Sequence, residues 1–313
     1  MKTPPDVQVV DLCAVTSAEL DDLLRREVRL WRERLLWDVS GAFAALRNII
    51  DRGGLPGKAV RVNGRTVGYA YYKLAGRLGV IAGLAVSPDW SDTGLGEVLL
   101  QQTVNDLRLQ SVSRIESPFV PIDGPCLTRA FESQGFRTYW REFLCCELGR
   151  TRGPMNVPAM VSLEPWRKTD LHEAAAILRA AYDAGVEAEI HEPYRTLDGC
   201  RGVLDDILNQ GGCGFPVPEA SAVARYRGQG VGFVVVTEIA PRQAHLTQIA
   251  VLPDYQRRGV GRLLLDYSLR RLAELQFDTL SLIVSRSNDR ALGMYQTMGF
   301  RSVLAFPVFI WER

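Results

Sequence analysis

The chain has 313 residues, and a length-based expectation of about 150 residues per domain favours two domains over one. Its hydrophobic fraction of 47% and charged fraction of 23% are typical of a soluble globular protein. The net charge of +1 gives no electrostatic reason to expect binding to nucleic acid or to an anionic membrane surface.

The sequence contains no recognisable signal for export, membrane insertion or metal binding. The first ten residues lack the apolar core of a signal peptide, and no run approaches the roughly 18 consecutive apolar residues of a membrane span. The cysteines and histidines do not have the spacing of metal ligands, so free, mostly buried thiols are expected. These observations predict a cytoplasmic protein without a metal.

The predicted elements occur twice in the same order. In the first half, an opening strand and a helical region precede three strands, a glycine-rich turn, a helix and a further strand, and the second half repeats this order. The predicted strands are 7–12, 58–63, 65–74, 78–86 and 112–119, then 160–164, 221–227, 231–239, 244–251 and 277–284. A short helix and an aromatic-rich closing strand end each half. Hairpins followed by a strand–helix–strand crossover predict an α/β fold with a mixed sheet flanked by helices.

The residues themselves also repeat at a nearly constant shift along the chain. The segment 85–90 matches 250–255, the glycine turn 94–96 matches 259–261, and Gly135-Phe136 matches Gly299-Phe300. Between the copies, 149–158 contains two prolines, two glycines and few apolar residues, as expected of a linker. The predicted domains are therefore residues 1–150 and 159–313.

The turn of the second copy has the features of a phosphate-binding site. It lies between a predicted strand and a predicted helix, whose first N–H groups lack partners and carry partial positive charge. Glycines 259 and 261 remove the Cβ atoms that would hold phosphates away from the backbone, and Arg257 and Arg258 add positive charge. The alternative is that the glycines only allow close packing of helix on strand.

With these residues in place, the chain resembles the GCN5-related N-acetyltransferase superfamily in a tandem arrangement that covers nearly all of it. The turn Gln256 to Gly261 matches the family's Q/R-x-x-G-x-G/A pattern, and Asn288, Ala291, Tyr295 and Gly299-Phe300 follow at family spacing. The resemblance implies two domains with mixed, mostly antiparallel sheets, acetyl-CoA as co-substrate, and direct transfer to the amine of a small molecule or peptide.

The resemblance also implies roles for particular residues of the second copy. Backbone N–H groups at a splay in the motif strand would hold the thioester carbonyl, Asn288 would cap a short helix and touch the pantetheine arm, and Tyr295 would act as general acid. The implied coenzyme-binding residues are Ile249, Ala250, Val251, Gln256, Arg257, Arg258, Gly259, Val260, Gly261, Arg262, Asn288 and Tyr295. A tyrosine that only packs its ring in the core is the alternative for Tyr295.

Candidates for the general base are less well defined by the sequence. His245 precedes Arg258 by the distance at which some family members place a catalytic glutamate, and strand alternation predicts that it shares a face with Ile249. Glu238 is the second candidate, and ordered water is a third possibility. A cluster of acidic residues, Glu187, Glu189, Glu192 and Asp198, either attracts a cationic amine or forms a solvated surface.

The first copy has lost the chemical groups at the matching positions. Asp92 and Thr93 replace the two arginines, Val80 replaces the histidine, and Phe131 replaces the tyrosine. We therefore expect a non-catalytic first domain and an N-acetyltransferase site in the second. Two alternatives stay open: an acetyltransferase resembling mycothiol synthase, which is also a tandem protein, and a non-catalytic acyl-CoA sensor or scaffold. An oligomer is possible but not indicated.

Overall fold

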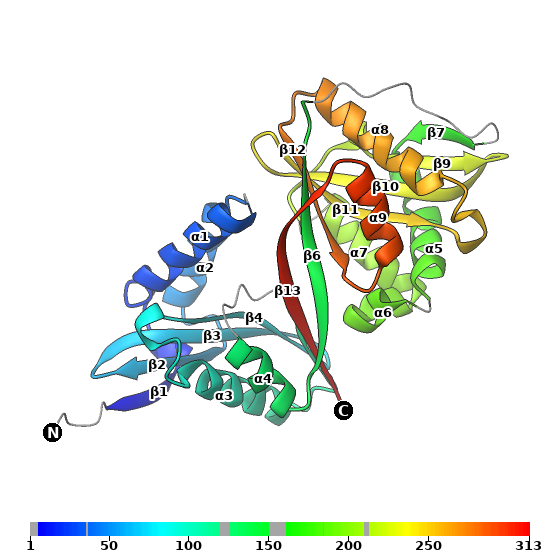
Figure 1. Ribbon diagram of the computed structural model, residues 1–313. Coiled ribbons are helices and arrows are strands. Elements are labelled where there is room, and N and C mark those ends of the chain that lie inside the picture. Colours follow the sequence, from blue (N-terminus) through cyan, green and yellow to red (C-terminus); the bar gives the residue numbers. More distant parts are fainter. Residues whose placement is uncertain (1–5, 36, 119–124, 150–160, 184, 210–212) are drawn as a thin grey trace. The chain divides into compact units, whose positions relative to one another are not determined.

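The computed structural model describes residues 6–35, 37–118, 125–149, 161–183, 185–209 and 213–313, which form two compact units (Figure 1). Unit 1 consists of Met1–Trp140 together with Phe306–Arg313, and unit 2 consists of Arg141–Ala305. The helices of the described residues include none with both the length and the apolar character to cross a bilayer.

Unit 1 is a mixed sheet with helices on both faces. Strands β1 to β4 pair antiparallel in sequence order, and β4 then pairs in parallel with β5. The strands are β1 (Val7–Asp11), β2 (Gly57–Val62), β3 (Arg65–Ala75), β4 (Leu78–Val86) and β5 (Arg114–Ser117). The helices are α1 (Asp21–Leu35), α2 (Ser40–Asp51), α3 (Leu95–Leu109) and α4 (Pro125–Ser133), with short 3₁₀ helices η1 (Leu12–Ala14) and η2 (Pro88–Trp90). Side chains of α3 and α4 form the core on one face, and those of α1 and α2 form the core on the other.

Unit 2 repeats this arrangement. Strands β7 (Val161–Pro165), β9 (Ala222–Tyr226), β10 (Gln229–Ala240) and β11 (Gln243–Val251) pair antiparallel in that order, β11 pairs in parallel with β12 (Thr279–Ser285), and the short β8 (Phe215–Pro216) pairs with β10. The helices are α5 (Leu171–Tyr182), α6 (Val186–Ile190), α7 (Leu197–Asn209), α8 (Val260–Glu274) and α9 (Asp289–Thr297), with 3₁₀ helices η3 (Lys168–Asp170), η4 (Glu192–Arg195), η5 (Pro218–Ala220) and η6 (Pro253–Tyr255).

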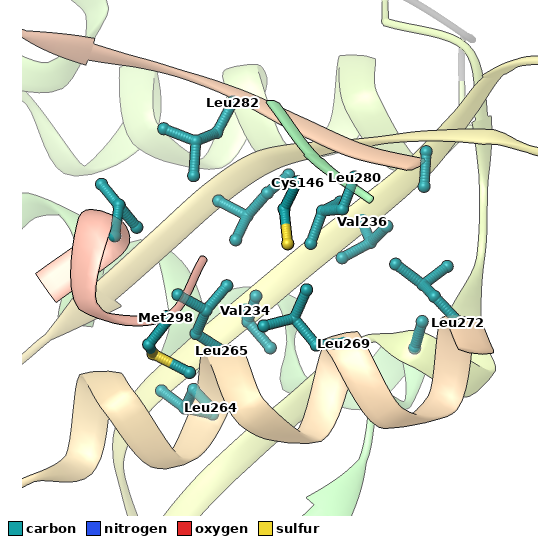
Figure 2. Close-up of a cluster of buried hydrophobic side chains, with 14 of the residues drawn as sticks. Cys146, Val234, Val236, Leu264, Leu265, Leu269, Leu272, Leu280, Leu282 and Met298 are labelled. Atoms are coloured by element: carbon teal, nitrogen blue, oxygen red, sulfur yellow. The ribbon is translucent and has the colours of Figure 1, made fainter. Parts of the chain in front are cut away.

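The core of unit 2 is divided between the two faces of its sheet. Figure 2 shows one side: Leu264, Leu265, Leu269 and Leu272 of α8 pack against Val234 and Val236 of β10 and Leu280 and Leu282 of β12. In the sequence, the i, i+4, i+7 spacing of Leu265, Leu269 and Leu272 predicts a buried helix stripe, and all three side chains are buried. On the opposite face, α5, α6 and α7 pack against side chains that include Phe233 and Ala250. A site built at this sheet can take side chains from both faces.

The last strand of each sheet comes from the other sequence repeat. Strand β6 (Arg137–Glu147) ends the first repeat, yet its residues 141–147 pair antiparallel with β12 in unit 2. Strand β13 (Arg301–Glu312) ends the second repeat, yet Phe309–Glu312 pair with β5 in unit 1. The compact units therefore differ from the sequence boundaries 1–150 and 159–313 at both strands. Apart from Gly149, the expected linker at 149–158 lies outside the described residues.

The predicted fold class is confirmed. Both units have mixed, mostly antiparallel sheets covered by helices, and the predicted strands are present with small differences at their ends. The longest extension is in β10, which begins at Gln229 and ends at Ala240 because its hairpin partners β9 and β11 continue the ladder on both sides.

Candidate active site

The sheet of unit 2 opens between β11 and β12. The parallel pairing of these strands joins Gln243–Leu246 to Thr279–Leu282 and then ends. Beyond Leu246, β11 continues along β10, and within the described part of the chain no strand pairs with its other edge. The N–H of Leu252 donates to the carbonyl of Val231 at 2.9 Å. Since alternate residues of a strand turn their N–H groups to opposite edges, the N–H groups of Ile249 and Val251 face the opening.

The opening contains two of the three predicted carbonyl-binding residues in a suitable orientation. Ile249 and Val251 present backbone N–H groups, whereas Ala250 pairs with Phe233 and has its N–H on the β10 side. The carbonyl of Val251 also faces the opening, because it accepts a hydrogen bond from Gln256 Nε2 at 3.1 Å. Gln256 accepts a second bond from Arg290 at 3.2 Å, so this side chain ties the end of β11 to the turn and to α9.

A β-bulge in β11 changes the face on which His245 lies. Val235 pairs with Gln248 and Val236 with Leu246, which leaves Thr247 as the extra residue. Consequently Leu246 and Ile249 share the α8 face, and His245 lies on the opposite face from Ile249. The prediction that His245 and Ile249 share a face is therefore wrong, because simple alternation ignores the bulge.

His245 is enclosed rather than exposed to a reacting group. Its Nδ1 lies 2.9 Å from Ser281 Oγ, its ring stacks on Phe143, and its side chain is buried. Burial disfavours the charged imidazolium and lowers the pKa of His245 to about 3. These surroundings favour a neutral histidine that serves the packing of the sheet.

Glu238 lies at the far end of β11. It pairs with Ala244 beside the β10–β11 turn, and its Oε1 accepts a hydrogen bond from the N–H of Arg242 at 3.1 Å. With a strand rise of about 3.4 Å per residue, this puts Glu238 roughly 20 Å from Ala250. The structure does not bring Glu238 to the opening.

The predicted phosphate-binding turn begins helix α8. Gly259, the N-cap residue, has φ +84°, and Arg257 has φ +61°. The first hydrogen bond of the helix is donated by Leu263 to the Gly259 carbonyl, so the N–H groups of Val260, Gly261 and Arg262 point out of the helix end. Such a helix start binds anions through its free N–H groups and its partial positive charge.

Gly261 is not required by the packing of the protein. A Cβ at this position would lie 3.8 Å from Met294 Sδ and 3.8 Å from Val251 Cγ2, which is ordinary van der Waals contact. Close packing of helix on strand therefore does not explain the glycine. The glycine leaves the backbone accessible at this point, because a side chain would occupy the space beside Val251.

The charged side chains of the turn differ in their contacts. Arg257 and Arg258 are exposed, and the guanidinium of Arg258 lies 5.7 Å from the ring centre of Tyr255. Arg262 donates to Thr297 Oγ1 at 3.2 Å, which joins the start of α8 to the end of α9. Arg257 and Arg258 thus place positive charge beside the start of α8, and Arg262 also attaches this helix start to α9.

Asn288 and Tyr295 have the predicted positions on helix α9. The Oδ1 of Asn288 accepts a hydrogen bond from the N–H of Ala291 at 3.2 Å, so Asn288 is the N-cap of this helix. Tyr295 is buried in the α8-side core and touches the ring of Phe300. Burial, and secondarily the charge of Glu187, raise the pKa of Tyr295 above its ordinary value. Among the described residues no group accepts a hydrogen bond from its hydroxyl, whose proton is thus not committed to the protein.

A polar cluster on the opposite face of the sheet was only partly predicted. Glu187 of α6 accepts a hydrogen bond from Ser285 Oγ at 2.6 Å and forms an ion pair with Arg141 Nη2 at 3.1 Å. Gln248, beside the bulge, donates to the hydroxyl of Tyr194. Sequence reasoning named Glu187 among four acidic residues but did not identify Arg141, Ser285 or Gln248. The other three acidic residues, Glu189, Glu192 and Asp198, are exposed.

The matching turn of unit 1 has a different backbone conformation. Gln256 has ψ 159°, whereas Ser91 at the matching position has ψ −37°, and Asp92 does not share the positive φ of Arg257. The peptide between these two positions is therefore turned over in unit 1 relative to unit 2. In addition, the N–H and the hydroxyl of Thr93 both donate to the carbonyl of Trp90, at 3.3 and 2.6 Å.

In unit 1 the parallel pairing of β4 with β5 ends at Val80 and Glu116, and a side chain of the same unit lies at the edge of β4 beyond this opening. Val86, which corresponds to Val251, has its carbonyl bonded to Arg26 Nη1 of helix α1 at 3.2 Å. Phe131, at the position of Tyr295, is fully buried and stacks on Phe309 with ring centres 3.9 Å apart. Within the described residues of either unit, no group of three or more histidine, cysteine or acidic side chains could hold a metal ion.

Two matching halves, each with a mixed sheet, an opening at its parallel pair and a glycine turn at a helix start, define a tandem protein. A model of the Acetyltransferase (GNAT) family matches residues 19–136 and 177–300. The chain belongs to this family, and each unit contains one of the matches.

Relatives and solved structures agree with this assignment. The chain is 42% identical over 65 residues to [Ribosomal protein bS18]-alanine N-acetyltransferase from Escherichia coli (strain K12), which is 21% of this chain and 44% of that relative. The chain thus spans less than half the length of this curated relative. It is 27% identical to a mycothiol acetyltransferase from Acidimicrobium ferrooxidans over 261 residues, or 80% of each protein. A GCN5-related N-acetyltransferase from Sphaerobacter thermophilus has the same fold, with a TM-score of 0.73, 15% identity, and coverage of 99% of this chain and 97% of that one.

Proposed function

We propose that unit 2 transfers an acetyl group from acetyl-CoA directly to the amine of an acceptor, and that unit 1 is not catalytic. The observation that carries the proposal is the position of the anion-binding helix start of α8 beside the open edge of β11. Gln256 connects the two, since it follows the strand and bonds to the carbonyl of Val251. A single elongated ligand can therefore contact both.

The residues present fit acetyl-CoA. Phosphates are anions that suit the N–H groups of Val260 to Arg262 and the charge of Arg257 and Arg258. The amide groups of a pantetheine arm suit the edge of β11, where the N–H groups of Ile249 and Val251 face the opening. Gly261 leaves space between these two regions.

Each group of unit 2 then has a defined task. Acetyl-CoA, when bound, supplies an activated thioester and a thiol leaving group. The N–H groups of Ile249 and Val251 stabilise negative charge that develops on an oxygen placed at the opening. The phenol of Tyr295 is buried in the core on the α8 side, and its raised pKa keeps the hydroxyl protonated. This hydroxyl can therefore donate its proton to the departing thiolate.

The proton of the attacking amine does not need His245 or Glu238 in this proposal. His245 is buried with a strongly lowered pKa, and Glu238 lies at the far end of β11. Water at the opening is the acceptor that agrees best with these positions.

Two alternatives make different predictions. The similarity to a mycothiol acetyltransferase over 80% of the chain favours a mycothiol-type acceptor as the second candidate. A sensor or scaffold would bind acetyl-CoA but release no free thiol with any amine. Mass measurement of the acetylated acceptor separates the first alternative from the main proposal, and thiol release separates the second.

The decisive experiment uses a matched pair of glycines. A Cβ at Gly96 meets Leu127 and Val86 at 3.7 Å, nearly the surroundings of Gly261, so Gly96→Glu and Gly261→Glu impose similar demands on the fold. We expect Gly261→Glu to weaken acetyl-CoA binding at least about a hundredfold, because a carboxylate meets the phosphates, and Gly96→Glu to leave it unchanged. Native mass spectrometry should show one coenzyme per wild-type chain. Two per chain, or equal losses in both variants, would contradict the proposal.

A further inference from the structure

The carboxylate of Glu187 is held in one orientation by two other elements. Ser285, the last residue of β12, donates to Oε1 at 2.6 Å, and Arg141 of β6 contacts Oε2 at 3.1 Å. Ser285 and Arg141 are paired in the β12–β6 ladder, so they approach Glu187 from adjacent strands. Only 13% of the Glu187 side chain and 17% of the Arg141 side chain are exposed. An acidic residue with this degree of enclosure is unusual on a short surface helix.

Two tyrosine rings belong to the core against which helix α6 packs. Tyr182 of α5 and Tyr194 of η4 meet edge to face with ring centres 5.0 Å apart. The charge of Glu187 raises the pKa of both phenols, after burial, which is the larger cause. Aromatic faces combined with a carboxylate form the environment that recognises an ammonium group, through cation–π attraction and a charged hydrogen bond.

Glu187 and Tyr295 approach the opening of the sheet from opposite faces. Tyr295 belongs to the core on the α8 side, whereas the helix that carries Glu187 packs on the other side. Glu187 nevertheless contributes to the raised pKa of Tyr295. Beyond Leu246 and Leu282 the described residues of β11 and β12 no longer pair with each other, so the sheet is open between the face of Tyr295 and the face of Glu187.

The cluster also retains unused hydrogen-bonding capacity. A carboxylate has about four acceptor positions, and the contacts with Ser285 and Arg141 leave room for further donors. Within the described residues, the buried Nε–H of Arg141 has no hydrogen-bond partner. Buried donors of this kind normally bind protein, water or ligand. The cluster thus offers an acceptor for an ammonium and, beside it, a donor for an oxygen atom.

We infer that Glu187 binds the ammonium group of the acetyl acceptor, that Ser285 is a positioning residue that holds its carboxylate, and that Arg141 both holds the carboxylate and donates its Nε–H to an oxygen atom of the acceptor. The acceptor class is a primary amine with an oxygen atom close to the nitrogen, as in an amino acid amide or an amino alcohol. This inference rests on the proposed function, since it assigns the acceptor side of the same site. It also means that strand β6, from the first sequence repeat, contributes a residue to the site of unit 2.

The test measures amine binding separately from coenzyme binding. Wild-type protein saturated with CoA is titrated calorimetrically with glycinamide, ethanolamine and 2-phenylethylamine, and with 2-phenylethanol as an uncharged control. We expect the amines with a nearby oxygen to bind best and the alcohol control not to bind. Glu187→Gln should weaken amine binding at least about tenfold, because it replaces a charged hydrogen bond with a neutral one, while acetyl-CoA affinity stays within about twofold. Glu187→Asp should recover part of the loss.

Control variants separate a local role from general damage. Glu189→Gln lies on the same helix but on its exposed side, and it should leave amine binding unchanged. Ser285→Ala removes one support of Glu187 without changing the charge, and we expect an intermediate, roughly threefold loss.

Two results overturn the inference: wild-type protein that binds none of the amines, and amine affinity that is equal in Glu187→Gln and Glu189→Gln. If wild-type protein does not bind acetyl-CoA, the proposed function fails. If it binds acetyl-CoA but its amine affinity is indifferent to Glu187, only the inference fails.

Discussion

The two glycine turns of this chain have kept the same framework and differ in what a ligand would meet. Gly94 and Gly259 have φ +81° and +84° and stand at the starts of equivalent helices of equal length, α3 and α8. The bulge in the preceding strand is also kept, since Ala82 is the extra residue of β4 as Thr247 is of β11. These shared features are needed to pass from strand to helix, with or without a ligand.

The differences concern the surfaces that would contact a coenzyme. In unit 1 the peptide between Ser91 and Asp92 has the opposite orientation to its counterpart in unit 2. The N–H and the hydroxyl of Thr93 donate to the carbonyl of Trp90, and Arg26 donates to the carbonyl of Val86. In unit 2 the corresponding carbonyl bonds to Gln256, and two arginines flank the helix start. A glycine pattern therefore reports the shape of the chain, and the neighbouring donors and charges decide whether an anion can bind.

The largest expected difference between the units concerns proton donation. Tyr295→Phe should lower the rate of thiol release from acetyl-CoA about a hundredfold, because a positioned acid typically contributes that much or more. Acetyl-CoA affinity should not change, since the ring and its packing stay. Phe131→Leu, at the matching position of unit 1, should leave turnover unchanged despite a small cost in stability. Initial rates with the best amine acceptor provide the measurement, and a wild-type rate for Tyr295→Phe would contradict the general-acid role.

A smaller effect is expected when the charges of the turn are exchanged. The double variant Arg257→Asp, Arg258→Thr gives unit 2 the side chains of unit 1, and Asp tolerates the left-handed backbone at position 257. We expect acetyl-CoA affinity to fall about tenfold and its dependence on salt to weaken, because two cations are lost. Calorimetry at low and high salt checks this.

The reverse change should not create a second site. Asp92→Arg with Thr93→Arg supplies the cations to unit 1 but leaves the peptide orientation and Arg26 as they are. A second bound coenzyme in this variant would show that charge alone separates the two turns.

A contrast in stability rather than in activity is the opposite response of the two units to pH. His245 has a pKa lowered by burial to about 3, so unit 2 should lose about 1.4 kcal/mol of unfolding free energy per pH unit as the pH falls below 6.5. Burial raises the pKa of Glu27 in unit 1 to about 7, although the hydrogen bond from Tyr69 opposes this shift. Unit 1 should therefore lose stability at a similar rate as the pH rises from 4.5 towards 7.

Hydrogen exchange resolves these responses by unit. Amides of β11 should lose protection at pH 5, and amides of β3, which carries the Glu27 partner Tyr69, should lose it at pH 8. His245→Gln should flatten the first response and Glu27→Gln the second. Equal slopes in both units would indicate that other groups control the pH dependence.

Much of the fold followed from periodicity, turn residues and the internal repeat. The strands, the buried stripe of α8 and the cap at Asn288 are local properties, so a single sequence contains their signals. The position of Tyr295 followed from the family resemblance. The bulge at Thr247 has no clear local signal, and this is why the face of His245 was predicted wrongly.

The polar cluster around Glu187 is harder to predict from the sequence for a different reason. Arg141, Glu187 and Ser285 are far apart along the chain and meet only because β6 pairs with β12 and α6 lies above both. Gln256, which precedes the turned peptide, likewise bonds to Val251 and Arg290, and Arg290 is distant in sequence. Neither the pairing of strands distant in sequence nor the orientation of one peptide group produces a periodic pattern in the sequence.

The exchange of closing strands has a consequence for biosynthesis. Residues up to Trp140 of unit 1 leave the ribosome long before Phe306–Arg313, which supply the strand beside β5. At common elongation rates this delay is on the order of ten seconds, during which β5 has an open edge. A nascent chain in this state needs protection from association with its neighbours. It also follows that a stop codon shortly before position 306 would damage the first unit, although the lesion lies at the other end of the gene.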